Sequence, residues 1–122
     1  MATITRFEDL DVWKKSMKIS ILIYNLFKNV KDYGMKDQIQ RAVVSIPSNI
    51  SEGFERTSDK DSARFYTIAK GSAGEVRTQI YLSYALGYIN LEEKNELIHE
   101  IETISKMLFQ LISYKNQKIL RS

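Results

Sequence analysis

The segment that decides the fold is Ser45-Ile46-Pro47-Ser48-Asn49-Ile50-Ser51-Glu52-Gly53, which holds the only proline of the 122-residue chain. Its small and polar residues are, taken alone, weak helix formers. Apolar side chains nevertheless continue through it at positions 39, 43, 46, 50 and 54, which share one face at 3.6 residues per turn. This continuity predicts one helix over about 36–55. We expect a kink at Pro47, because proline removes a backbone donor and crowds the preceding turn.

One more amphipathic helix is predicted before this one, over about 10–30, and two are predicted after it, over about 59–87 and 91–118. Phe7 is expected to act as a hydrophobic anchor before the first helix. Gly34 follows the end of the first helix and suits a positive φ there. Ser58 or Asp59 can cap the third helix, and Asn90 with Glu93 forms the pattern of a capping pair for the fourth. Long helices joined by short turns pack antiparallel. Residues 1–122 are therefore predicted to form a single all-α domain, an up-down-up-down four-helix bundle.

A second small-residue segment, Ala69 to Glu75, lies on the third helix and resembles the first in composition. Together the two segments predict a close approach of the second and third helices, which Gly53→Leu or Ala73→Leu would disrupt. Residues of both segments, together with Arg41 one turn before the first, form a proposed structural polar motif, namely Arg41, Ser45, Asn49, Glu52, Gly53, Ser72 and Glu75. Glu75 is expected to accept hydrogen bonds from Arg41, Ser45 or Asn49, within the chain or between subunits. A ligand pocket at the same residues is the alternative.

Composition limits the possible environment of the chain. No apolar run approaches the ~20 residues that a bilayer requires. Acidic residues at positions 8, 9 and 11 precede any apolar run, which is the wrong polarity for a secretory signal. The chain has no cysteine, so disulfides and thiolate metal sites are excluded. These features favour a cytoplasmic protein.

The first helix carries more apolar surface than one core face requires. Trp13, Met17 and Tyr24 form a second apolar arc beside the expected core arc. Surplus apolar surface of this kind indicates a partner subunit.

Aromatic and basic residues alternate along one strip of the third helix. The candidate nucleic-acid contacts on it are Tyr66, Lys70, Arg77, Tyr81 and Tyr88. Cations would bind phosphates and rings would stack on bases, and the net charge of +3 permits such a partner. Weaker candidates lie on the first helix, at Lys14, Lys18 and Lys28. The alternatives are a tyrosine-rich rim of the core or of a subunit interface, and a solvated lysine face.

Enzymatic chemistry finds little support in the sequence. His99 is the only histidine, and Glu96 with His99 gives half of the Glu-x-x-His pattern of di-iron bundles, which need two such pairs and two more glutamates. No glycine-rich phosphate loop follows a strand, and no nucleophile and base form a local signature. We therefore predict no catalytic residues, no metal and no cofactor, with His99 on the surface.

Three segments in order along the chain carry a family resemblance: Phe7 to Trp13, Arg41 to Gly53 and Gly71 to Glu75. They resemble the four-helix bundle proteins encoded in intervening sequences of bacterial 23S rRNA genes, a family that includes the accessory variability determinant of diversity-generating retroelements. The resemblance implies a bacterial, non-enzymatic bundle that assembles into a pentamer. For the retroelement branch it also implies binding to a reverse transcriptase and to nucleic acid. The shared motifs do not distinguish the two branches.

Together these observations predict a homo-oligomeric binding or scaffold protein associated with RNA or DNA through basic and tyrosine-rich surface. The alternative is a structural oligomer that engages only protein partners.

Overall fold

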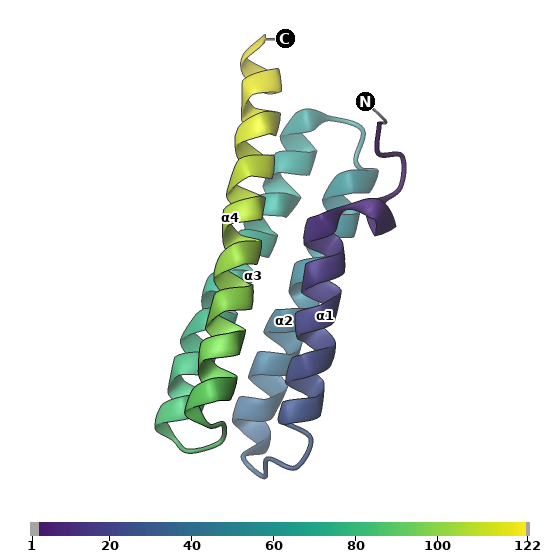
Figure 1. Cartoon of the computed structure of the whole chain (residues 1–122). Helices are drawn as coiled ribbons and strands as arrows, with labels where there is room; N and C mark the ends of the chain where they lie inside the picture. Colours follow the sequence, from purple (N-terminus) through teal and green to yellow (C-terminus); the bar gives the residue numbers. More distant parts are fainter. Residues whose placement is uncertain (1–2, 122) are drawn as a thin grey trace.

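Four α-helices run alternately up and down in the computed structural model, which describes residues 3–121 (Figure 1). A short 3-10 helix precedes them, and the elements in order are η1 (Phe7–Asp9), α1 (Asp11–Leu26), α2 (Tyr33–Glu55), α3 (Asp59–Ala85) and α4 (Leu91–Arg121). The predicted all-α four-helix bundle is confirmed.

The core lies along the axis of the bundle and receives one apolar face from each helix. On α2 the four residues Ile39, Val43, Ile46 and Ile50 are fully buried, so the face that spans Pro47 is the core face, as predicted. Burying one such aliphatic side chain contributes about 1.5–3 kcal/mol. The other helices supply Val12, Ile19, Ile23, Ala69, Ala73, Val76, Ile80, Leu97, Ile101, Ile104 and Leu108.

Side-chain caps fix where the helices begin. Asp32 accepts a hydrogen bond from the Met35 backbone N–H at 3.1 Å and starts α2 three residues earlier than predicted. Gly34 therefore lies inside α2, and the expectation of a positive φ there is wrong. Among the described residues only Gly87, after α3, has a positive φ, of 80°. The predicted pair of Asn90 and Glu93 is confirmed by reciprocal bonds of 2.9 and 2.8 Å.

The first helix is shorter than predicted. It ends at Leu26 rather than near Val30, because the chain leaves the helix through tight turns in which the Val30 N–H donates to the Phe27 carbonyl at 3.1 Å. Phe27 is itself fully buried, so this turn closes the lower end of the core.

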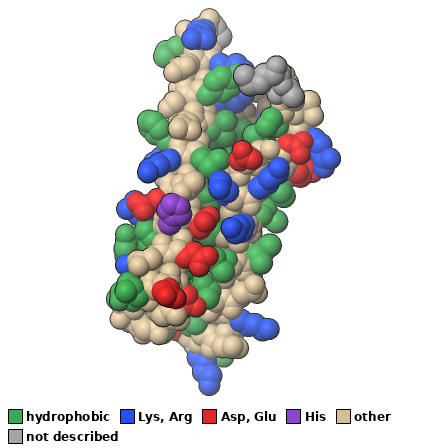
Figure 2. Space-filling model, viewed as in Figure 1, with side chains coloured by type: hydrophobic (Ala, Val, Ile, Leu, Met, Phe, Trp, Pro, Cys, Tyr) green, Lys and Arg blue, Asp and Glu red, His purple; other side chains and the backbone are tan. Residues whose placement is uncertain are grey.

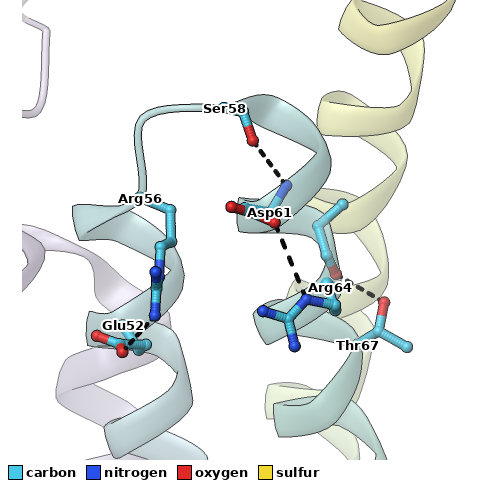
Figure 3. A network of polar contacts seen from close by, with 7 residues as sticks. Glu52, Arg56, Ser58, Asp61, Arg64 and Thr67 are labelled. Atoms are coloured by element: carbon cyan, nitrogen blue, oxygen red, sulfur yellow. Dashed lines mark hydrogen bonds and ion pairs between the residues drawn. The ribbon is translucent and has the colours of Figure 1, made fainter.

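Exposed ion pairs surround the α2–α3 turn (Figure 3). Ser58 caps α3 through a 3.1 Å bond from the Asp61 N–H, and Glu52 pairs with Arg56 at 2.8 Å. Arg56 and Arg64 both lie over the ring of Phe65, at 4.7 and 4.4 Å from its centroid. Pairs this exposed contribute ~1 kcal/mol or less each, so they order the turn more than they stabilise the fold.

A contact from α4 holds the same end of the bundle. Lys115 donates to Asp59 at 3.0 Å and, with Lys118 nearby, lowers the pKa of this carboxyl group. Asp59 opens α3, so the pair joins the start of α3 to the last third of α4.

The helix α2 continues through Pro47 without a break. Its apolar face outweighs the loss of one backbone donor, since the residues on both sides of the proline are buried in the same core. The kink expected at this position stays a prediction.

At Gly53, α2 and α3 lie so close together that there is no room for a side chain. A Cβ atom at this position would lie 2.7 Å from Tyr66 Cε1 and 3.1 Å from the Ser62 carbonyl oxygen. Tyr66 is only 2% exposed, so its ring has little room to retreat. The same burial raises the pKa of its hydroxyl group to about 12. Gly71 and Gly74 differ, because a Cβ on either would meet open space. Close approach in the second small-residue segment therefore involves Ala69 and Ala73, not its glycines.

Replacing single glycines with alanine tests this contrast. We expect Gly53→Ala to lower the free energy of unfolding by about 1–3 kcal/mol, because the new methyl group overpacks the Tyr66 ring. The matched control Gly71→Ala should raise it by up to about 1 kcal/mol, since alanine is the better helix former and nothing obstructs it. Urea unfolding followed by circular dichroism measures both, and equal effects of the two substitutions would contradict the close approach.

Candidate functional site

An apolar groove of about 540 Å³ runs between α1 and α2 on the outside of the bundle. Ile21 is 58% exposed in it, and Met17, Tyr24 and Val44 are also exposed. Phe7 packs on Trp13 at one end, with ring centroids 5.4 Å apart, which agrees with its predicted role as an anchor. We call this surface the apolar groove; it is lined by Phe7, Trp13, Met17, Ser20, Ile21, Tyr24, Asn25, Val44, Pro47, Ser48 and Ser51.

Ser20 connects the two walls of the apolar groove. Pro47 has no N–H to donate to the carbonyl of Val43, one helical turn before it. The buried Ser20 hydroxyl lies 3.3 Å from that carbonyl oxygen and 2.7 Å from the Ser16 carbonyl oxygen of its own helix. One proton serves both acceptors, so the bond to α2 is the longer branch of a shared hydrogen bond. A side chain of α1 thus partly replaces the donor that α2 lacks.

Three residues of the structural polar motif, Ser45, Asn49 and Ser72, form a bonded cluster between α2 and α3. Ser45 Oγ lies 2.9 Å from Ser72 Oγ across the helix pair, and the Asn49 amide donates to Ser45 Oγ at 3.0 Å and to its carbonyl oxygen at 2.8 Å. Glu52 pairs with Arg56 on the surface, and Gly53 makes the close contact with Tyr66. The serines and Asn49 therefore bond one another.

A second groove, also of about 540 Å³, lies between α2 and α3 nearer the α1–α2 turn. We call it the polar groove; it is lined by Met35, Gln38, Arg41, Glu75, Thr78, Gln79 and Leu82. Arg41 and Glu75 are both exposed here, and within residues 3–121 neither forms an ion pair. The expectation that Glu75 bonds Arg41, Ser45 or Asn49 is wrong within the chain, because its position on α3 leaves it in solvent. A bond between subunits stays a prediction.

The aromatic and basic strip of α3 does not form a continuous surface. Tyr66 lies in the core, so it is unavailable for stacking on a base, and its assignment to a nucleic-acid surface is corrected. Arg77 pairs with Glu102 of α4 at 3.0 Å. Lys70 is half-buried and lines a shallow groove toward α4. Tyr81 is exposed, with the Lys94 ammonium 5.8 Å from its ring centroid.

Tyr88 has a structural partner as well. Its hydroxyl donates to Asp32 Oδ2 at 2.7 Å, joining the α3–α4 turn to the α1–α2 turn. This bond, with the N–H of Met35 at the other carboxylate oxygen, lowers the pKa of Asp32. Most of the predicted strip is therefore engaged in holding the bundle together.

The lysines predicted on the first helix are exposed. Lys14 and Lys18 lie on α1 and Lys28 in the turn after it, and among the described residues none of the three side chains forms an ion pair. On the face that Figure 2 shows, Lys and Arg side chains are intermixed with Asp and Glu. A continuous basic block is absent from the face in view.

Comparison with known proteins now identifies the family. The model of the 23S rRNA-intervening sequence protein matches residues 8–110, which include every residue that lines the two grooves except Phe7. The chain belongs to this family. A crystal structure of a protein of unknown function from the S23 ribosomal protein family of Bacteroides thetaiotaomicron is similar, with a TM-score of 0.79 and 28% sequence identity. The similarity covers 83% of this chain and 97% of that one. No curated protein matches the chain.

This member of the 23S rRNA-intervening sequence protein family shows neither a metal-binding cluster nor a membrane-spanning helix within residues 3–121. His99 is exposed, as predicted, and residues 3–121 contain no group of three or more histidine, aspartate or glutamate side chains arranged to hold a metal ion. In that same range, none of the helices combines the length and apolar character needed to cross a bilayer.

Two residues of the grooves were not anticipated from the sequence. Ser20 looks like an interruption in an apolar run, and only the position of Val43 opposite it gives its hydroxyl a role. Gln79 is a polar residue within an apolar strip of α3, which indicates an unusual position. The strip alone does not indicate which residues of α2 face it.

A double-mutant cycle tests the bond between the groove walls. We expect Ser20→Ala to lower the free energy of unfolding by about 1 kcal/mol, because it removes a buried donor. In a Pro47→Ala background the cost should shrink by roughly half, since the restored N–H can donate to Val43. The control Ser51→Ala, whose hydroxyl bonds only the nearby Ser48 carbonyl on an exposed turn of α2, should change stability little. Additive effects of the two core substitutions would contradict the coupling.

Proposed function

We propose that this member of the 23S rRNA-intervening sequence protein family is a non-enzymatic, self-associating helical scaffold. The apolar groove is the observation that carries the proposal. It exposes several large apolar side chains side by side, and such patches on soluble proteins mark interaction sites. Its walls are two parallel ridges of helix, a shape that suits a third helix laid between them.

The occupant we propose is the outer face of α4 from a second copy. This helix has 31 residues, about 46 Å at 1.5 Å per residue, and its last turns project past the α2–α3 turn (Figure 1). Phe109 and Leu120 are 61% and 86% exposed, and eleven residues of spacing, about three helical turns, place them on one side of α4. Within residues 3–121 neither side chain lies in the core.

Groove and helix face are different surfaces of the same chain, so the proposed contact is heterologous. Contacts of this kind close into rings when the rotation between copies allows it and otherwise extend into filaments. The pentamer implied by the family resemblance is one such ring, and it supports a closed assembly.

Complementation between two charge variants tests the proposal. Wild-type protein should have a solution mass that is a multiple of the protomer mass in light scattering. Ile21→Glu blocks the groove and Phe109→Glu blocks the helix face, so each variant alone should be monomeric. Mixed together they should form a one-to-one dimer, because one intact groove and one intact helix face remain.

The control for an added surface charge is Tyr33→Glu, at an exposed position of α2 that lies outside the apolar groove. It should leave the assembly unchanged. A monomeric wild type, or two blocked variants that stay monomeric when mixed, would overturn the proposed contact.

Nucleic-acid binding is the second candidate function, and the unpaired lysines of α1 and of the turn after it favour it. Each phosphate contact to a single strand contributes about −0.7 to the slope of log K against log salt. We expect replacement of Lys14, Lys18 and Lys28 by Gln to make this slope about 2 less steep for a single-stranded RNA measured by fluorescence anisotropy. A Lys60→Gln, Lys106→Gln control on α3 and α4 should not change it. Absence of binding at low salt would exclude this candidate.

A further inference from the structure

A shallow groove of about 420 Å³ between α3 and α4 places two cations beside an exposed aromatic ring. We call it the basic groove; it is lined by Lys70, Ser105, Lys106, Phe109 and Gln110. Within residues 3–121 neither lysine forms an ion pair. Glu102, one turn before Lys106 on α4, does not neutralise them, because it pairs with Arg77 at 3.0 Å. An occupant that fits must therefore offer carboxylates beside an apolar surface.

One end of the apolar groove offers this combination. The stacked rings of Phe7 and Trp13 lie there, and Asp9 ends η1, which packs on both α1 and α2. Glu55 follows Ser51 by one turn of α2, so it extends the groove wall past the same end. Both carboxylates are exposed, and among the described residues neither forms an ion pair. We call this the acidic end of the apolar groove.

The arginines near the acidic end are already occupied. Arg6 pairs with Glu8 at 2.8 Å, and Arg56 pairs with Glu52 at 2.8 Å. Lys14, next to Trp13 in sequence, is a single cation against the two unpaired carboxylates. The acidic end therefore attracts a group of positive charge.

The opposite end of the apolar groove, at Tyr24 and Asn25, has the other sign. Residues 28–37, which follow it, hold three lysines and two aspartates. One of the aspartates, Asp32, already accepts a hydrogen bond from the Tyr88 hydroxyl at 2.7 Å. Two further lysines brought to this end would be repelled.

We propose that the basic groove of one copy of the chain receives the acidic end of the apolar groove of the next copy. This inference rests on the self-association proposed above and gives it a polarity, because Phe109 then enters at the acidic end. The rings of Phe7 and Trp13 cover Phe109, and four charges that are unpaired in one chain become paired between two. Complementary charges of this kind fix the orientation of a contact more than they add affinity.

Exchange of the charges tests this polarity. Lys70→Glu with Lys106→Glu should raise the Kd of self-association at least about tenfold, because attractive pairs become repulsive. Asp9→Lys with Glu55→Lys should do the same. A chain with all four substitutions should associate within about threefold of wild type, since both pairs are restored with their signs reversed. Analytical ultracentrifugation measures the Kd, and circular dichroism checks that each variant is folded.

A version of the exchange without Lys70 covers the case in which this half-buried position does not accept Glu. Lys106→Glu alone, at an exposed position, should still weaken the association. Adding Asp9→Lys or Glu55→Lys should recover part of the loss, and no recovery from either would contradict the pairing.

The matched control is Lys28→Glu with Lys31→Glu, which places two carboxylates at the opposite end of the apolar groove. It should leave the Kd within about threefold of wild type. Tighter association of this variant would mean that Phe109 enters at that end, and the proposed polarity would be wrong. The polarity is also overturned if the fourfold variant stays as weak as either double variant. In that case dissociation by Ile21→Glu and Phe109→Glu would still support the contact itself, whereas a monomeric wild type overturns both.

Discussion

The structure depends on the passage of α2 through Pro47. A proline inside a helix removes one backbone bond and often ends the helix. Here the four aliphatic residues on both sides of it are fully buried in one core, and this burial exceeds the cost of the lost bond. The Ser20 hydroxyl of α1 reaches the carbonyl that the proline leaves without a donor. The hydrogen bond that helps to position α1 on α2 therefore forms at the carbonyl group that Pro47 leaves without a donor.

On the side that faces α3, α2 is held in place by close packing at a glycine and by a hydrogen bond between serines. Gly53 lets the Tyr66 ring pack against the backbone, and the Ser45–Ser72 bond lies two turns away on the same helix pair. These contacts bring α2 and α3 together along their length. Because the two helices are fixed in this way, the polar groove between them is lined by both Arg41 and Glu75. These two residues are 34 positions apart in the sequence.

The two sides of α2 consequently present two chemically different grooves. The one toward α1 is apolar, and we propose that a second copy of the chain occupies it. The one toward α3 is lined by Arg41 and Glu75, which form no ion pair within residues 3–121. Membership of the 23S rRNA-intervening sequence protein family fixes the scaffold, while the proposed uses of the grooves come from the side chains that line them.

The sequence by itself determined the four helices, the continuity of α2 and most of the core, because periodic burial of apolar residues is a local signal. It also predicted the cap at Asn90, and it limited the cap of α3 to Ser58 or Asp59, of which the structure uses Ser58. Tertiary structure alone decided which polar residues meet. It placed Tyr66 in the core, left Glu75 without the expected donors and set Ser20 opposite Val43. Those outcomes depend on how helices rotate and where they cross, and packing between elements distant in the chain sets both.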